Sequence, residues 1–128
     1  MTPPDAATPH DPPTYQRLAM AWTDERVTVV TFAEGKADGV AVRELYEAVA
    51  GMLDDDLPRV VVDLVGVRHL GSGMLGMLVT AMKKLRQAGG RMAVAAGDPL
   101  VREEIRVMHL DRVLDVHETR ESAQKRVA

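Results

Sequence analysis

The chain has 128 residues, of which 46% are hydrophobic and only 3% aromatic, and its formal net charge is −3. This length is enough for one domain with a substantial core, which the composition makes aliphatic. The negative charge and the few aromatic rings argue against binding to nucleic acid, through either phosphates or bases. The absence of cysteine excludes disulfides, thiolate metal sites and cysteine nucleophiles.

Residues 1–14 are rich in proline and carry almost no large apolar side chain. This composition predicts a disordered tail, followed by a single domain over residues 15–128. The tail lacks the basic and apolar regions of a signal peptide. No apolar run in the chain reaches the roughly 20 residues that span a bilayer. We therefore expect a cytoplasmic protein without membrane insertion.

The first part of the domain predicts two strands and a helix. Alternating apolar residues indicate strands over 15–22 and 26–32, and the short turn between them favours an antiparallel hairpin. Residues 33–36 are expected to form a loop. Asp38 stands where a helix N-cap is expected, before an apolar stripe of helical spacing that continues to Leu53.

The stretch 59–90 predicts a buried strand, a short loop and a long amphipathic helix. Its three consecutive valines, 60–62, are typical of a strand that is covered on both faces. Ser72 stands at the start of the helix, whose apolar residues recur at helical spacing. Gly89 and Gly90 are expected to end that helix.

The remaining residues predict a strand over 91–96 and a further strand over 112–116, each followed by a helix. Asp98 and Pro99 are typical of a helix start, and Thr119 of a helix N-cap. The buried stripe of the first of these helices is expected to consist of Val101, Ile105 and Met108.

Strands that alternate with helices imply parallel pairing with right-handed crossovers. The predicted fold class is therefore α/β. It is a single domain with a small mixed β-sheet, made of an N-terminal antiparallel hairpin and then parallel strands, packed with about four helices.

Ser72 is the candidate functional residue. A serine before a helix commonly acts as an N-cap, which stabilises the helix by about 1 kcal/mol. It can also be a phosphoacceptor, because the flanking glycines give access to a kinase and the helix dipole favours a phosphate. A hydrolase nucleophile is disfavoured, since the Gly-x-Ser-x-Gly elbow is absent and no Asp–His pair is placed by a motif. Met74, near the start of the helix, is expected to be exposed and to offer an adaptable contact.

The sequence predicts no metal site, no cofactor and no catalytic residue. Neither the phosphate-binding nor the dinucleotide-binding glycine motif is present. If ATP takes part, a partner protein supplies it. The histidines do not have the spacing of metal ligands; they are His10, His69, His109 and His117.

The order of these segments resembles a STAS domain, the fold of bacterial anti-sigma factor antagonists. The resemblance runs from about Tyr15 to the C-terminus and is carried by RVVVDLVGVRHLGSGMLGML, KKLRQAGGRMAVAA, DPLVREEIRVMHLDRVLDV and ETRESA. In that family an anti-sigma factor that is a serine kinase phosphorylates a serine or threonine at the start of the helix. The unphosphorylated form binds the kinase and frees the sigma factor. Phosphorylation breaks the complex, and a phosphatase restores it.

The resemblance implies that Ser72 is the phosphoacceptor and that Asp38, Gly71, Gly73 and Met74 belong to the partner-binding surface. Its implied partners are an anti-sigma factor serine kinase, which supplies ATP, and a serine phosphatase. It implies a regulatory binding module that is not an enzyme, and a monomer or weak dimer. Gly71 stands where the family often has an aspartate, and Met74 where it usually has a glycine.

A second interpretation is a constitutive STAS adaptor, such as a subunit of a lipid-transport ABC complex or of a stressosome-like assembly. In an adaptor Ser72 is only a helix N-cap, so Ser72→Asp changes partner binding no more than the loss of a cap. The switch instead predicts that Ser72→Asp abolishes binding.

Overall fold

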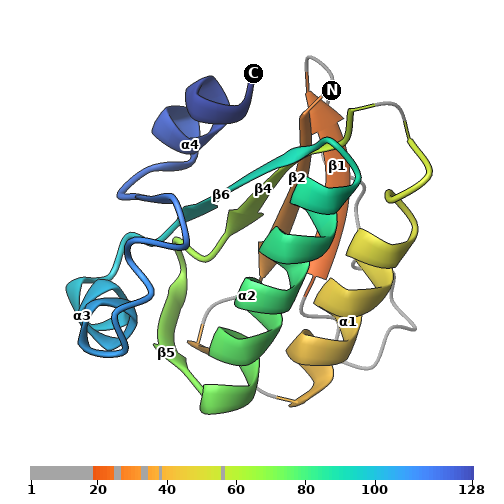
Figure 1. The fold of residues 1–128 in the computed structure, drawn as a ribbon. Coiled ribbons are helices and arrows are strands. Elements are labelled where there is room, and N and C mark those ends of the chain that lie inside the picture. The colour runs from red at the N-terminus through yellow and green to blue at the C-terminus, as the bar shows by residue number, and fades with distance from the viewer. Residues whose placement is uncertain (1–18, 25–26, 33–34, 38, 56) are drawn as a thin grey trace, which may run out of the picture.

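The computed structural model describes residues 19–24, 27–32, 35–37, 39–55 and 57–128 (Figure 1). The tail predicted at 1–14 lies outside these residues. The strands in the described part are β1 (Ala19–Asp24), β2 (Val27–Phe32), β3 (Gly35–Ala37), β4 (Arg59–Asp63), β5 (Val67–Leu70), β6 (Arg91–Ala95) and β7 (Val116–His117). The helices there are α1 (Gly39–Ala50), α2 (Ser72–Gln87), α3 (Pro99–Val107) and α4 (Arg120–Val127).

Five of these strands form one mixed sheet in the order β1-β2-β4-β6-β7. β1 and β2 are antiparallel, whereas β2, β4, β6 and β7 run parallel to one another. Helices connect the parallel strands, as such pairing requires. The predicted α/β class, with an antiparallel hairpin, parallel strands and four helices in the described part, is confirmed.

The central strand β4 is buried on both faces. Val60 and Val62 belong to the larger apolar cluster, which includes side chains from α1, α2 and α3. Val61 points to the other face of the sheet, where Ala123 and Val127 of α4 cover it. Figure 1 shows α1 and α2 side by side and α4 well apart from them. The run of valines therefore marks a doubly covered strand, as its composition predicts.

Two short strands replace expected loops. The loop expected at 33–36 is wrong in its second half, because β3 pairs in parallel with β5. β5 itself occupies most of the loop expected before Ser72. Its two end residues are buried and its two middle residues are exposed, so it lacks the alternation that indicates a strand. Pairing with β3, rather than a local pattern, makes this segment extended.

The end of α3 differs from the expectation. Met108 is not part of the buried stripe, because its side chain is 57% exposed, whereas Val101 and Ile105 are buried. The helix ends at Val107, since His109 adopts a positive φ of 58° and its N–H donates to the carbonyl of Arg106. Met108 therefore stands at the end of the helix and on its outer side.

The last strand is shorter than the expected 112–116, since β7 contains only Val116–His117. The N–H groups of Val113 and Leu114 both donate to the carbonyl of Leu110, at 3.0 and 2.7 Å. These bonds form a turn that buries Leu114. β7 therefore begins only after this turn, where the chain lies beside β6.

The end of α2 confirms the role predicted for the two glycines. Gly89 has a φ of +80°, and the N–H of Gly90 donates to the carbonyl of Leu85 at 2.7 Å. This is the Schellman arrangement, in which a left-handed residue stops the helix. Gly90 has a further constraint, because a Cβ atom there would lie 2.2 Å from the carbonyl oxygen of Pro58.

We predict that Gly90→Ala lowers the free energy of unfolding by more than about 2 kcal/mol, because the methyl group forces the backbone of Pro58 away. Gly76→Ala is the matched control. Gly76 is exposed in the middle of α2, and an added Cβ meets nothing within 4 Å. The control should gain about 0.5–1 kcal/mol from reduced backbone entropy in the unfolded state. Urea denaturation measures both changes, and a Gly90→Ala variant as stable as the wild type would contradict the close approach.

Candidate functional site

The start of α2 places Ser72 differently from the N-cap expectation. Gly71 is the N-cap, with extended backbone angles of φ −79° and ψ 164°. Its carbonyl accepts the N–H groups of Met74 and Leu75, both at 3.1 Å. The chain thus enters the helix one residue early, and the interpretation of Ser72 as the N-cap is wrong. Glycine is accepted at this position although it offers no capping oxygen.

The Ser72 hydroxyl is open to solvent. Its side chain is exposed, and within the described ranges no residue forms a hydrogen bond with it. Gly73 is also exposed, and a methyl group there would lie 3.7 Å from Val42 Cγ2 in α1. The first backbone N–H groups of a helix have no acceptor within the helix. The serine therefore stands at an accessible, electropositive helix end, beside α1.

The other residues predicted for the partner-binding surface differ in their exposure to solvent. Gly71 is half-buried and Gly73 exposed, so both can take part in a surface around Ser72. Met74 is 0% exposed and belongs to the main core, so its prediction as an exposed contact is wrong. It lies four residues before Leu78, on the helix face that packs against the sheet. Asp38 lies outside the described residues, so its proximity to Ser72 stays a prediction.

A groove borders Ser72 between β5, the start of α2 and α3. Its volume is about 610 Å³, which is within the range of ligand and peptide clefts. Buried Leu70 and Leu75 form part of an apolar floor. We call this feature the α2–α3 groove; it is lined by Arg68, His69, Leu70, Ser72, Leu75, Leu100, Glu103, Glu104, Val107 and Met108.

Two carboxylates of α3 stand at this groove. Glu104 Oε1 lies 3.4 Å from His69 Nδ1 and accepts the N–H of Leu70 at 3.3 Å, which ties α3 to β5. The Arg106 guanidinium, hydrogen-bonded to Glu103, holds the pKa of the Glu103 carboxyl below its ordinary value. Glu103 therefore keeps its negative charge at neutral pH, and the α3 side of the groove is acidic.

The sequence of the chain matches the model of a known protein family. The STAS domain model matches residues 19–123, from the first strand of the sheet into α4. The chain belongs to the STAS domain family. No match is found among curated protein sequences.

Solved STAS structures agree with this architecture. An anti-sigma factor antagonist from Mycobacterium paratuberculosis is 29% identical, with a TM-score of 0.74 over 85% of this chain and 92% of that one. An anti-sigma-factor antagonist (STAS) domain protein from Planctomyces limnophilus is 24% identical, with a TM-score of 0.73 over 86% and 97%. The Bacillus cell fate determinant SpoIIAA, in its phosphorylated form, is 17% identical, with a TM-score of 0.65 over 86% and 99%. The last two similarities show the fold alone.

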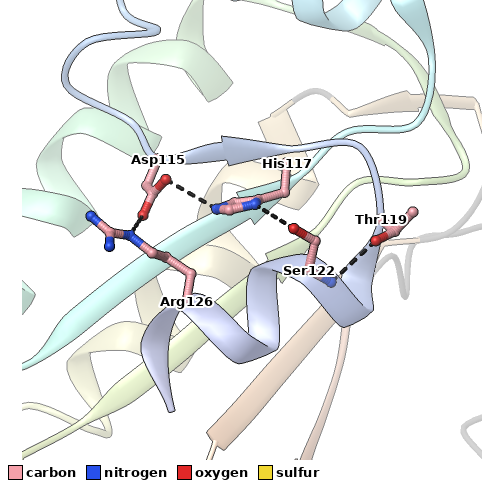
Figure 2. Close-up of polar contacts among 5 residues, drawn as sticks. All are labelled: Asp115, His117, Thr119, Ser122 and Arg126. Atoms are coloured by element: carbon pink, nitrogen blue, oxygen red, sulfur yellow. Dashed lines mark hydrogen bonds and ion pairs between the residues drawn. The ribbon is translucent and has the colours of Figure 1, made fainter.

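This STAS domain also contains a polar relay that the sequence reasoning missed. Figure 2 shows His117 between Ser122 and Asp115, with Nδ1 2.7 Å from the Ser122 hydroxyl and Nε2 3.0 Å from Asp115 Oδ1. Arg126 Nε donates to the other oxygen of Asp115 at 2.6 Å. The spacing of these four residues in the sequence could have indicated this relay. Positions 115 and 117 share a side of an extended segment, and 122 and 126 share a helix face.

The relay fastens α4 to β7. Carboxylate, imidazole and hydroxyl occur in this order where a serine is a nucleophile. Here, however, the Asp115 carboxylate is shared, because its other oxygen accepts a hydrogen bond from Arg126. The buried side chains of α4 are Ala123 and Val127, which are small. Polar contacts must therefore supply much of the attachment of this helix.

Asp63 is a buried carboxylate that the sequence reasoning also passed over. It is the one buried charged side chain in the described part of the chain. It accepts the Thr31 hydroxyl at 3.2 Å and the N–H of Val65 at 3.0 Å, and Arg120 Nη1 lies 3.9 Å away. Because buried carboxylates need such partners, Asp63 fixes the turn that leads from β4 to β5.

Within the part of the chain that the structure describes, no three His, Cys, Asp or Glu side chains lie together in a way that could hold a metal ion. No helix in this part of the chain is both long enough and apolar enough to cross a membrane.

We predict that Ser72→Ala changes the free energy of unfolding by less than about 0.5 kcal/mol, because the hydroxyl caps nothing. Asp98→Ala is the contrast, since Asp98 Oδ1 accepts the N–H of Leu100 at 2.8 Å as a true N-cap. Its loss should cost about 1 kcal/mol. Thermal or urea unfolding of both variants gives the comparison. An equal cost at the two positions would restore the capping role to Ser72.

We predict that Asp115→Ala loosens α4, because it removes the acceptor of both His117 and Arg126. These groups are partly exposed, so the expected cost is only about 1 kcal/mol. Amide hydrogen exchange in α4 should accelerate more than in α2. Lys125→Ala, an exposed change on the same helix, is the control and should leave the exchange unaltered. Unchanged α4 protection in Asp115→Ala would show that apolar packing alone holds the helix.

Proposed function

We propose that this STAS domain is a regulatory protein-binding module, an anti-sigma factor antagonist controlled by reversible phosphorylation of Ser72. The observation that carries the proposal is the exposed Ser72 hydroxyl, to which no described residue is hydrogen-bonded, on the first turn of α2. A serine used only as a cap directs its oxygen to the backbone N–H groups of that turn. Here the hydroxyl oxygen is available to a kinase that belongs to another protein.

The helix end suits a phosphate in the modified form. A phosphoserine adds about −1.5 to −2 charges at neutral pH. The first N–H groups of α2 and its dipole favour that charge over most other surface positions. The phosphate would also stand beside the α2–α3 groove, whose α3 side already carries Glu103 and Glu104.

The same charge explains how modification would release a partner. A partner that covers this face must remove water from the phosphate, which is costly unless cations compensate it. Within the described ranges, Arg68 is the cation on the groove itself, and the two glutamates oppose it. The unmodified form therefore presents a largely apolar docking face, and the phosphorylated form a strongly anionic one.

The proposed partners follow from the family. The relatives include a protein described as an anti-sigma factor antagonist and SpoIIAA in a phosphorylated form. By analogy, the partner of this chain is an anti-sigma factor with serine kinase activity, which brings ATP, and a serine phosphatase reverses the reaction. The chain itself acts by binding, in the cytoplasm, and not as an enzyme.

A constitutive adaptor is the second candidate function, and it does not depend on a capping role for Ser72, although Gly71 and not Ser72 is the N-cap. It still makes a distinct prediction for partner binding. A pull-down with wild type, Ser72→Ala and Ser72→Asp separates the two functions. Binding abolished by Asp alone supports the switch, and equal binding by all three supports the adaptor.

The direct test is phosphate-affinity electrophoresis of the protein isolated from its host. We expect a retarded band that disappears in Ser72→Ala. Ser122→Ala is the matched control, because Ser122 is the only other serine in the chain. The retarded band should persist in this control. Absence of any Ser72-dependent band under all growth conditions, including stress and stationary phase, would contradict the proposal.

A further inference from the structure

A second pocket lies at the opposite end of α2 from Ser72, where α2 ends and β6 begins. Its volume is about 300 Å³, at the lower end of the range for small-molecule sites. Its walls come from α2, β6, the residue before β7, and α4. We call it the α2–α4 pocket. Arg86 at this pocket lies roughly 21 Å from Ser72 along the helix axis, at about 1.5 Å per residue, so the function proposed for Ser72 does not involve it.

Three arginines converge on the α2–α4 pocket from three different elements. Arg86 lies in the last turn of α2, Arg91 begins β6, and Arg126 lies in α4. The side chains of Arg86 and Arg91 are exposed and form no ion pair with any described residue. Arg126 donates its Nε to Asp115, which leaves both Nη groups of its fork for a further acceptor. Guanidinium groups held together repel one another, and an anion between them removes that repulsion.

A single carboxylate lines the pocket, and it is already engaged. Asp115 accepts from Arg126 at 2.6 Å and lies 3.0 Å from His117 Nε2 (Figure 2). Three guanidiniums and one carboxylate leave two positive charges unbalanced in the lining. This local excess occurs in a chain whose net charge is −3. A ligand with two negative charges balances the lining, whereas a monoanion leaves one cation uncompensated.

The edge of the sheet adds a backbone donor to the same pocket. β7 begins at Val116, so on that side β6 pairs with a strand only from Val94 onward. The N–H of Val94 donates to the carbonyl of Asp115, and N–H groups two residues apart in a strand point to the same side. The N–H of Met92 therefore points toward the pocket that Met92 lines, where no described strand accepts it.

The floor of the pocket is apolar. Met82, Met92 and Val127 line it, and each of them is at most 3% exposed. The flexible methionine side chains adapt to the shape of a ligand. Such a floor suits a ligand that has an organic part beside its anionic group.

We propose that the α2–α4 pocket binds a small organic phosphate monoester. A guanidinium fork matches phosphate oxygens in a bidentate manner, and a phosphate monoester carries about −1.5 to −2 charges at neutral pH. The phosphate lies among the three arginines and accepts the N–H of Met92, and the organic part lies on the methionines. The ligand thereby joins α2 to α4, which cover opposite faces of the sheet, so its binding stabilises the folded domain.

Amide NMR of the unmodified full chain tests the site, with phenyl phosphate and phenyl sulfate as probes at about pH 8, where the phosphate is a dianion and the sulfate a monoanion. The two probes have the same ring and nearly the same shape. We expect phenyl phosphate to bind with a Kd of about 1 mM or below, with the Met92 amide among those that shift most. Phenyl sulfate should bind at least tenfold more weakly. Inorganic phosphate, which has no ring to cover the floor, should also bind about tenfold more weakly.

Three results of this titration would overturn the proposal. They are the absence of any saturable shift with phenyl phosphate, equal affinities for the phosphate and the sulfate, and shifts centred on the amides of Ser72 and Gly73. The last result would place the anion at the start of α2 instead.

Neutral variants test the arginines one at a time. Arg86→Gln and Arg91→Gln should each weaken phenyl phosphate binding about fivefold or more, because each removes a charge-assisted hydrogen bond. Lys84→Gln is the matched control, since Lys84 is an exposed cation in the same last turn of α2 but does not line the pocket. It should bind as the wild type does. Circular dichroism verifies that all variants are folded. Equal losses in the three variants, or no loss at Arg86 and Arg91, would contradict the site. These measurements need no kinase, so their outcome is independent of Ser72 phosphorylation.

Discussion

The burial of β4 on both faces is the constraint on which the rest of the structure depends. A strand with Val60 and Val62 on one side and Val61 on the other must have cover in both directions. Parallel neighbours β2 and β6 satisfy its backbone, and parallel pairing requires crossover helices. Helices α1, α2 and α3 supply the cover on one face, and α4 supplies it on the other. The layers of the fold therefore follow from three adjacent β-branched residues.

The candidate site follows from the way the chain leaves that strand. Asp63 ends β4 as a buried carboxylate and accepts the N–H of Val65, which turns the chain toward β5. β5 pairs with β3 and is tied to α3 by the contacts of Glu104. The next residue, Gly71, is the N-cap of α2. The exposed Ser72 is thus positioned by buried groups, so the proposed phosphoacceptor stands on a rigid scaffold.

Sequence patterns predicted the long elements of this fold well and the short ones poorly. The valine run, the helix stripes and the caps at Asp98 and Thr119 depend on local periodicity and local hydrogen bonds, which a sequence displays directly. The pair β3–β5 depends on residues more than thirty positions apart, so no local pattern reveals it. The same limit applies to Met74 and Met108. Methionine suits core and surface alike, and the backbone geometry at the helix ends decided which one is buried.

The two serines of the chain lie on opposite sides of the sheet, in different surroundings. On the α4 side, the relay through His117 and the small side chains of the helix hold a structural layer, and Ser122 is engaged in that relay. On the α3 side, Ser72 has no hydrogen bond to a described residue and borders an apolar groove. The two serines of the chain thus differ in what their hydroxyls already do. A phosphate on Ser122 would break contacts that hold the fold, whereas a phosphate on Ser72 would change only a surface. Under the proposed function, modification at Ser72 would therefore alter binding without a cost in stability, which a reversible switch requires.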